Sequence, residues 1–276
     1  MIPIDSETLR YGLGCFETIK VYPKRKIAFL DEHIERLLYG IQVLNLEECL
    51  YSNQATLENN KNLDKNNGSI NWFETKEIFI KQTQSFVEET NSQKCFEAPQ
   101  ILRLIFTKET GLQCFLIAYK EKNSFLKLMI SNLWRVDSEC PLNQIKSFNY
   151  LKNYFAHAEA KKAGFDDSIL LNEKGEIVEA SKANIFFRSK DGDWLTPSLE
   201  SGCLPGIIRG KLIRLLNAKE EIINANSFER FESCFVCNSL IELQKISSIN
   251  DYQFRDFNTS NIKKSLRNLV GLQETE

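Results

Sequence analysis

The chain has 276 residues, of which 42% are hydrophobic and 26% are charged, and its formal net charge is −2. This composition is typical of a soluble globular protein with one large core or two smaller ones. No basic cluster indicates a nucleic-acid partner, no apolar run reaches the ~20 residues that cross a bilayer, and the N-terminus lacks the features of a signal peptide. We therefore expect a cytoplasmic protein that binds neither nucleic acid nor membrane.

The N-terminal part of the chain predicts two strands and a helix. Residues 13–22 alternate between apolar and polar side chains, and residues 27–29 follow a turn, so both segments are expected to be strands. Asp31 is the expected N-cap of the next helix. The apolar stripe of that helix consists of Ile34, Leu37, Leu38, Ile41 and Leu44. Arg36 lies on the helix flank outside this stripe, so we expect its replacement to leave the fold intact.

The middle of the chain predicts an insertion and a domain boundary. Residues 52–71 are rich in asparagine and show no periodicity, which indicates a loop insertion. The expected elements are a helix at 75–89 and strands at 101–107, 114–119 and 126–134. The polar stretch 121–125 is the expected linker. It would join a small N-terminal α/β domain (1–120) to a larger C-terminal domain (126–276).

The region from 144 to 187 predicts one helix followed by a hairpin. Tyr150, Tyr154 and Ala158 recur at helical spacing, and Gly164 is a natural helix stop. The expected strands cover 167–171 and 176–178, with a turn at 172–175. Two ionisable side chains flank these elements, Lys146 before the helix and Glu179 after the second strand.

The C-terminal part predicts a helix whose start is suited to an anion. Pro205 stands where a helix would begin, and Gly206 permits close approach of the backbone. The first amides of this helix, those of Ile207 and Ile208, have no partners inside the helix and would point toward an anion. The remaining expected elements are a strand at 235–240, which ends in the polar pair Asn238 and Ser239, and a helix at 260–270.

The cysteines do not indicate a metal or redox site. Eight are scattered along the chain, mostly in apolar runs, and we expect them to be buried thiols rather than disulfides. Cys234 and Cys237 have C-x-x-C spacing, but no second pair accompanies them. With only His33 and His157 as histidines, a zinc site is not expected.

Five short motifs follow one another between residues 10 and 240. They are R-Y-G-L-G-C-F-E-T at 10–18 with H-I-E-R-L at 33–37; Lys146 with N-Y-L at 149–151 and E-A-K-K-A-G at 159–164; E-A-S-K-A-N-I-F at 179–186; G-C-L-P-G-I-I-R at 202–209; and N-S-L at 238–240. Together they resemble the class IV pyridoxal-phosphate (PLP) enzymes. This family includes branched-chain and D-amino-acid aminotransferases and 4-amino-4-deoxychorismate lyase.

The resemblance implies a fold and a set of site residues. The fold would be the two-domain α/β (α+β) architecture of the family, with PLP in the cleft between the domains. Lys146 would hold PLP covalently and move the substrate's α-proton, Glu179 would face the pyridine nitrogen, and Tyr150 would lie beside the ring hydroxyl. The phosphate would be bound by Arg36, the amides of Ile207 and Ile208, and the Ser239 hydroxyl. Because the family forms homodimers, a homodimer is expected.

The motifs do not decide the reaction. The short chain, the run Gly206-Ile207-Ile208-Arg209 and the run Asn238-Ser239-Leu240 resemble the lyase, which releases pyruvate and forms 4-aminobenzoate for folate synthesis. Gln113 stands where an arginine for the substrate would be expected, so the residues that bind the substrate carboxylates are unassigned. The alternative is a transaminase of the same family for branched-chain or D-amino acids. A non-catalytic binding protein on the same fold is a third interpretation.

Overall fold

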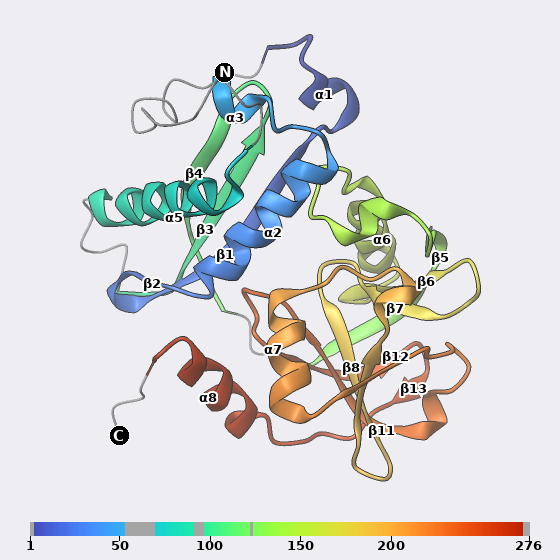
Figure 1. Ribbon diagram of the computed structural model, residues 1–276. Coiled ribbons are helices and arrows are strands. Elements are labelled where there is room, and N and C mark those ends of the chain that lie inside the picture. The colour runs from blue at the N-terminus through green and yellow to red at the C-terminus, as the bar shows by residue number, and fades with distance from the viewer. Residues whose placement is uncertain (1–2, 53–69, 91–96, 122–123, 273–276) are drawn as a thin grey trace. The chain divides into compact units, whose positions relative to one another are not determined.

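The computed structural model describes residues 3–52, 70–90, 97–121 and 124–272 (Figure 1). The chain divides into two compact units. The first comprises Met1–Lys120 and Ile145–Asn149, and the second comprises Glu121–Gln144 and Tyr150–Glu276. Most of the expected insertion at 52–71 and part of the expected linker at 121–125 lie outside the described residues. The insertion and the two-domain division with that linker therefore stay predictions.

The described part of the first unit is a four-stranded antiparallel sheet with helices on one face. The sheet order is β2-β1-β3-β4. Its strands are β1 (Gly14–Tyr22), β2 (Lys26–Ile27), β3 (Gln100–Thr107) and β4 (Gly111–Ala118), and its helices are α1 (Glu7–Tyr11), α2 (Leu30–Val43), α3 (Cys49–Ser52) and α5 (Trp72–Glu89), with a 3₁₀ turn at Pro23–Arg25. Helices α2 and α5 cover one face of the sheet (Figure 1).

The core of the first unit follows from the alternation predicted for β1. Ile19 and Val21 point toward α2 and are fully buried, together with Leu37 and Ile41 of the helix stripe. Successive residues of a strand point to opposite faces, so Phe16, Thr18 and Lys20 lie on the other face of the sheet. One face of β1 therefore packs in the apolar core through Ile19 and Val21, whereas the other face carries Phe16, Thr18 and Lys20.

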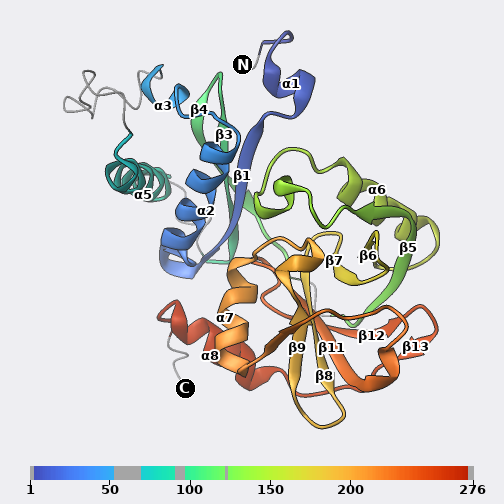
Figure 2. The same cartoon turned by 45° about the vertical axis from the view of Figure 1, so that its right-hand side comes forward.

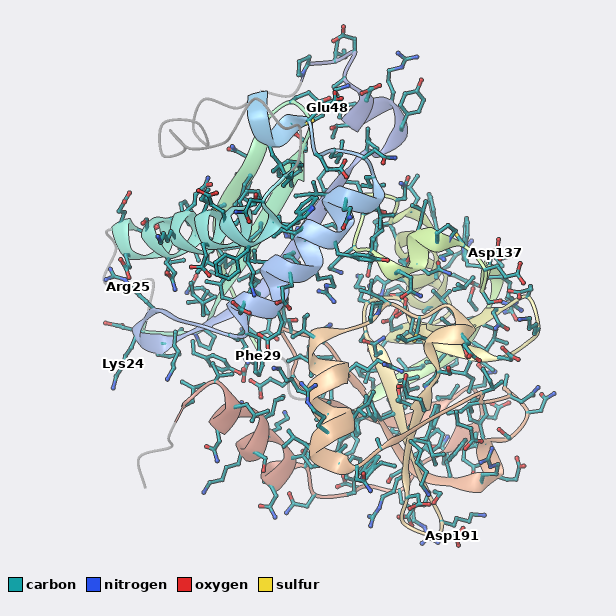
Figure 3. All side chains as sticks on the ribbon, in the orientation of Figure 1. Lys24, Arg25, Phe29, Glu48, Asp137 and Asp191 are labelled. Atoms are coloured by element: carbon teal, nitrogen blue, oxygen red, sulfur yellow. The ribbon has the colours of Figure 1, made fainter. Side chains whose placement is uncertain are left out.

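The start of α2 differs from the prediction. Phe29, labelled in Figure 3, is the N-cap and has a left-handed backbone with a φ of 51°, and the helix begins at Leu30. The prediction of Asp31 as N-cap is wrong because this left-handed residue turns the chain into the helix before Asp31 is reached. Asp31 instead lies in the first helical turn, where a negative charge is favoured, and its carboxylate is 2.7 Å from the Lys76 ammonium of α5.

The described part of the second unit is built on a mixed nine-stranded sheet. Its path is β10-β9-β8-β11-β12-β5-β6-β7, and β13 pairs with β12. The strands are β5 (Leu126–Val136), β6 (Asp167–Asn172), β7 (Ile177–Ala180), β8 (Asn184–Ser189), β9 (Trp194–Pro197), β10 (Lys219–Glu221), β11 (Phe231–Cys237), β12 (Gln244–Ile249) and β13 (Tyr252–Gln253). The helices are α6 (Leu151–Lys162), α7 (Ile207–Leu216) and α8 (Ser260–Leu269), with 3₁₀ turns at Pro141–Gln144, Leu199–Ser201 and Phe228–Arg230.

The helix and hairpin expected between 150 and 178 are confirmed. Tyr150 is the N-cap of α6, and Gly164 has the positive φ of 86° that a helix stop requires. Strands β6 and β7 pair antiparallel, and Gly175 closes their turn with a φ of 79°. Within the described ranges, no helix is both long and apolar enough to cross a membrane.

Candidate active site

In the first unit, Arg36 is held by a buried carboxylate. Its Nε and one terminal nitrogen each lie 2.7 Å from an oxygen of Glu17 on β1, and His33 Nδ1 lies 2.7 Å from Glu17 Oε2. Glu17 and His33 are fully buried, and the Arg36 side chain is only 10% exposed. Arg36 is thus an enclosed partner of Glu17 and not a solvated charge on the helix flank. Glu17 stood in the quoted motif, but no role had been assigned to it.

The surroundings of Glu17 keep it ionised. Burial raises the pKa of this carboxyl, but the charges and hydrogen bonds of Arg36 and His33 outweigh burial and lower its pKa to about 2. Burial lowers the pKa of His33 in spite of Glu17. The cluster therefore has one carboxylate and one permanent cation, which fixes the guanidinium in place.

We expect this cluster to make stability depend on pH in acid. Because the pKa of Glu17 is lower in the folded protein than its ordinary value of ~4.3, its stabilising effect is complete above that value and is lost as pH falls toward 2. The free energy of unfolding of wild type, minus that of Glu17→Gln, should fall by on the order of 2–3 kcal/mol between pH 5 and pH 2. Denaturant titrations at several pH values measure it. A difference that does not change with pH would show that Glu17 is not selectively ionised in the fold.

Lys146 lies in the short segment Ile145–Asn149, which belongs to the first unit although the chain before and after this segment belongs to the second. Its carbonyl accepts a hydrogen bond of 3.0 Å from the Phe16 amide, and Ser147 pairs with Cys15, so this segment continues the sheet along the edge of β1. The Lys146 ammonium lies 4.5 Å from the centre of the Phe16 ring. Lys146 is therefore on the Phe16 face of β1, whereas Glu17 and Arg36 are on the opposite face.

The same face carries a cation that the sequence analysis did not single out. Arg103 of β3 is directly opposite Thr18, and Ile105 is directly opposite Phe16. Arg103 is half-buried, and its Nε is inaccessible to solvent without a hydrogen-bond partner among the described residues. Leaving a buried charged donor unpaired is costly, so this guanidinium is suited to an anion supplied from outside the chain. Because Phe16 and Thr18 are two residues apart on one strand, their Cα atoms are roughly 7 Å apart.

In the second unit, the loop between β7 and β8 connects the predicted site residues. The Tyr150 hydroxyl donates to the Ser181 carbonyl at 3.1 Å, and the Asn153 amide donates to the same oxygen at 2.9 Å. The Ser181 hydroxyl donates to Asp167. The hydroxyl of Tyr150 is thereby fixed against the loop that follows Glu179.

Asn184 links Glu179 to the start of α7. Its side-chain amide donates to Glu179 Oε2 at 3.2 Å and to the Leu204 carbonyl at 2.9 Å, and the Leu204 amide donates to the same Glu179 oxygen at 3.2 Å. A Cβ at Gly206 would lie 2.1 Å from Asn184 Oδ1, so only glycine fits as the N-cap of α7. Gly206 has no side chain to accept from the first helical amides, which include those of Ile207 and Ile208.

Ser239 lies in a turn that is attached to the same loop. Its neighbour Asn238 donates from its side chain to the Lys182 carbonyl at 2.9 Å and accepts from the amides of Leu240 and Ile241 at 2.9 and 3.0 Å. The loop from Ser181 to Asn184 therefore holds Tyr150, Glu179, the start of α7 and the turn with Ser239. Arg36 and Lys146 belong to the first unit, where each has the contacts described above.

The C-x-x-C pair has no active-site character. Cys234 and Cys237 lie in β11 and are buried as free thiols. Burial raises the pKa of both thiols, so neither forms the thiolate that redox or metal chemistry requires.

The sequence profile of the family described as "Amino-transferase class IV" matches residues 14–249. The chain belongs to this family. It is therefore a PLP-dependent enzyme with the fold type IV architecture, as the motifs predicted. A protein of Rickettsia bellii named "Probable branched-chain-amino-acid aminotransferase" is 28% identical over 256 residues, which make up 89% of this chain and 81% of that protein.

Two solved structures have the same fold. One is from Legionella pneumophila and is provisionally named 4-amino-4-deoxychorismate lyase; it has a TM-score of 0.74 and 23% identity, and the match covers 98% of this chain and 94% of that one. The other is the branched-chain aminotransferase of Thermoproteus uzoniensis with norvaline; it has a TM-score of 0.77 and 23% identity, and the match covers 98% and 89% of the two chains. At this identity the likeness establishes the architecture and leaves the substrate open.

The residues of this class IV enzyme suit PLP. In the second unit, the carboxylate of Glu179 is fixed by two donors and can pair with a protonated pyridine nitrogen. The bare backbone at Gly206 leaves the first amides of α7 able to bind a phosphate. In the first unit, Lys146 offers the amine that an aldehyde cofactor requires. The assignment of these residues to PLP is our proposal.

Proposed function

We propose that this protein is a 4-amino-4-deoxychorismate lyase, which converts its substrate into pyruvate and 4-aminobenzoate for folate synthesis. The observation that carries the proposal is Arg103, on the same sheet face as Lys146, whose buried Nε has no hydrogen-bond partner in the part of the chain that the structure describes. The substrate of the lyase has two carboxylates, one on the ring and one on the enolpyruvyl ether. A substrate anion beside Arg103 would supply the partner that its buried Nε needs.

The site residues would share the work of this reaction. PLP, when bound, supplies the electron sink for the substrate carbon that carries the amine. Lys146 takes the proton from that carbon and is placed to return one to the departing enolpyruvyl group, which leaves as pyruvate. Glu179 keeps the pyridine nitrogen protonated, and Tyr150 orients the ring from its fixed position against Ser181. Arg36, Ser239 and the amides of Ile207 and Ile208 hold the phosphate.

Two sequence features also support the lyase. The run Gly206-Ile207-Ile208-Arg209 has an apolar third residue, and Asn238-Ser239-Leu240 has the lyase pattern. In the structure, Asn238 shapes the turn that presents Ser239 by accepting two backbone hydrogen bonds. The asparagine of this pattern thus has a physical role in the turn.

A transaminase is the second candidate, and the named relatives favour it. The Rickettsia bellii protein and a 29% identical protein of Methanocaldococcus jannaschii are both named as branched-chain aminotransferases. Arg103 would suit this reaction too, because an acidic amino-group donor carries a second carboxylate. The two reactions differ in their need for a keto acid, which provides the test.

The test is a product assay without a keto acid. The holoenzyme is mixed with 4-amino-4-deoxychorismate, and pyruvate and 4-aminobenzoate are measured over time. We expect equal amounts of both products over many turnovers. Failure to form them, together with transfer of the amino group from L-leucine or D-alanine to 2-oxoglutarate, would replace the lyase with the transaminase.

Arg103→Gln is expected to weaken substrate use while leaving the fold intact. Loss of a charge-assisted hydrogen bond should cost ~1.5–3 kcal/mol, so kcat/KM should fall by roughly 10- to 100-fold. Arg103→Lys should retain part of the activity. Lys81→Gln removes a charge from an exposed position of α5 and is the matched control. Equal kcat/KM for Arg103→Gln and Lys81→Gln would remove Arg103 from the site.

We also propose that the enzyme is a homodimer, and a surface of the second unit supports this. Leu133 of β5 is 75% exposed and Leu151 of α6 is 70% exposed, and the rings of Tyr154 and Phe155 on α6 are exposed as well. The Phe155 ring stacks on the Trp134 ring with 5.4 Å between the ring centres, and the Tyr154 ring meets it edge-on with 5.3 Å between the centres. Leu151, Tyr154 and Phe155 are neighbours at helical spacing on α6, and exposed apolar residues that gather in this way are unusual on the surface of a monomer.

Charges placed at these exposed apolar positions should dissociate the dimer. Leu133→Asp combined with Tyr154→Asp is expected to shift the mass in sedimentation equilibrium from dimer to monomer, because burying two carboxylates in an apolar contact is costly. Ile222→Asp, at another exposed apolar position of the second unit, should remain dimeric. A wild-type monomer with full activity would contradict the homodimer itself.

A further inference from the structure

The loop after β7 is held by α6 and by the start of β6, which pack against each other (Figure 2). The amide of Ser181 donates to the Ser168 carbonyl at 2.9 Å, and its hydroxyl donates to the Asp167 carboxylate. Ser181 is fully buried. Because both anchors lie at the start of β6, they fix the orientation of the Ser181 peptide, whose carbonyl accepts from Tyr150 and Asn153 of the α6 segment.

The carboxylate of Asp167 is itself held at one oxygen. Its Oδ1 accepts from the Ser168 amide at 2.8 Å and lies 3.1 Å from His157 Nδ1 on α6. The same oxygen accepts from the Ser181 hydroxyl. Hydrogen bonds to an ionised acceptor are stronger than those between neutral groups, and bonds that share a partner support one another. A chain of hydrogen bonds therefore connects the partly exposed His157, through Asp167, with the buried loop.

The Ser181 carbonyl decides where the Tyr150 proton points. A phenol has one proton to donate, and Tyr150 donates it to this carbonyl at 3.1 Å. Toward any other neighbour, the Tyr150 oxygen can then act only as an acceptor. If the carbonyl turned away, the hydroxyl could rotate and donate to another group.

We propose that Asp167 is a positioning residue that sets the direction of the hydrogen bond between Tyr150 and the ring hydroxyl of PLP. This rests on the proposed place of Tyr150 beside that hydroxyl. With Asp167 present, Ser181 keeps its carbonyl toward Tyr150, and the Tyr150 oxygen accepts from the ring hydroxyl. Without Asp167, the Ser181 hydroxyl loses its acceptor, the peptide can turn, and Tyr150 becomes able to donate to the ring oxygen.

The absorbance spectrum of bound PLP tests this direction, because the band depends on the protonation of the ring oxygen. Spectra, kcat and KM are measured with PLP-loaded wild type, Asp167→Ala, Asp167→Asn and the control Asp191→Ala, which removes an exposed carboxylate from the turn between β8 and β9 (Figure 3). We expect Asp167→Ala to shift the band and to lower kcat by roughly ten- to a hundredfold with little change in KM. Asp191→Ala should change none of these. Asp167→Asn keeps an oxygen that accepts from Ser181 and should retain the wild-type spectrum.

Tyr150→Phe distinguishes positioning from a purely structural role. Because Asp167 acts through the Tyr150 hydroxyl, Asp167→Ala should not shift the band further when it is added to Tyr150→Phe. A further shift of the same size in that double variant, or an unshifted band in Asp167→Ala, would overturn the proposal. If Asp167→Ala fails to fold, Ser181→Ala removes only the hydroxyl and should shift the band in the direction expected for Asp167→Ala; an unshifted band there would overturn the proposal too.

Failure of the underlying assignments gives different results. An unchanged band in Tyr150→Phe would overturn the place of Tyr150 beside the ring, and the role of Asp167 with it. The lyase proposal fails separately, in the product assay, because the spectrum of bound PLP without substrate does not depend on which reaction follows.

Discussion

Lys146→Ala is expected to abolish covalent attachment of PLP and to lower turnover by roughly 10²–10⁴-fold, the usual contribution of a positioned acid–base group. The reason is geometric as well as chemical. Ser147 and the Lys146 carbonyl pair with β1, so the backbone of this segment is fixed and no other lysine can take the position easily. Turnover with the lyase substrate and the absorbance of the PLP-loaded protein measure the two effects.

Lys162→Ala is the matched control for this prediction. Lys162 is exposed at the end of α6, in a region that the site does not use. The variant should keep both attachment and turnover. A Lys146→Ala protein that retains more than a tenth of wild-type turnover would show that another group moves the proton.

Arg36→Ala is expected to destabilise the first unit strongly. Removing the guanidinium leaves Glu17 as a fully buried carboxylate whose one remaining partner among the described residues is His33, and breaking such a pair costs ~3–5 kcal/mol. The free energy of unfolding from denaturant titration measures this. Replacement of Arg36 should therefore harm the fold, contrary to the expectation from its place outside the apolar stripe, because its side chain is the enclosed partner of Glu17.

A double substitution separates charge from packing at this position. Glu17→Gln with Arg36→Met removes both charges at similar volume and should recover most of the lost stability, because no unpaired charge remains. A loss that is equally large in the double variant would show that packing and not charge governs the cluster. The phosphate role of Arg36 is better tested with Arg36→Lys, which keeps a cation for Glu17 while losing the paired geometry of the guanidinium.

The elements with clear periodicity could be predicted from the sequence. The alternation of β1, the stripe of α2 and the stop of α6 at Gly164 all follow from spacing and glycine placement. The start of α2 was misplaced because a left-handed phenylalanine is not a capping signal in any sequence rule. Strands β10 and β13 have only three and two residues, too few to show a pattern, and β12 (Q-K-I-S-S-I) has no regular alternation of apolar and polar residues.

The predicted site residues came from motifs, and the structure adds what the motifs cannot state. Arg36 and Glu17 are nineteen positions apart in the sequence. Only the packing of α2 against β1 brings their side chains together. Asn184 was visible in its motif, but its link between Glu179 and Leu204 is a three-dimensional fact. Arg103 could have been noticed as a cation at a strand position between the buried residues Leu102 and Leu104. That its buried Nε has no hydrogen-bond partner among the described residues can be seen only in the fold.

The most direct test of this account is to locate the covalently bound cofactor. PLP-loaded wild-type protein is reduced with borohydride, digested and mapped by mass spectrometry. We predict a single pyridoxyl group, on the peptide that contains Lys146, and none on that peptide in Lys146→Ala. A pyridoxyl group on another lysine of the wild-type protein, with Lys146 unmodified, would contradict the assignment on which the proposed chemistry depends.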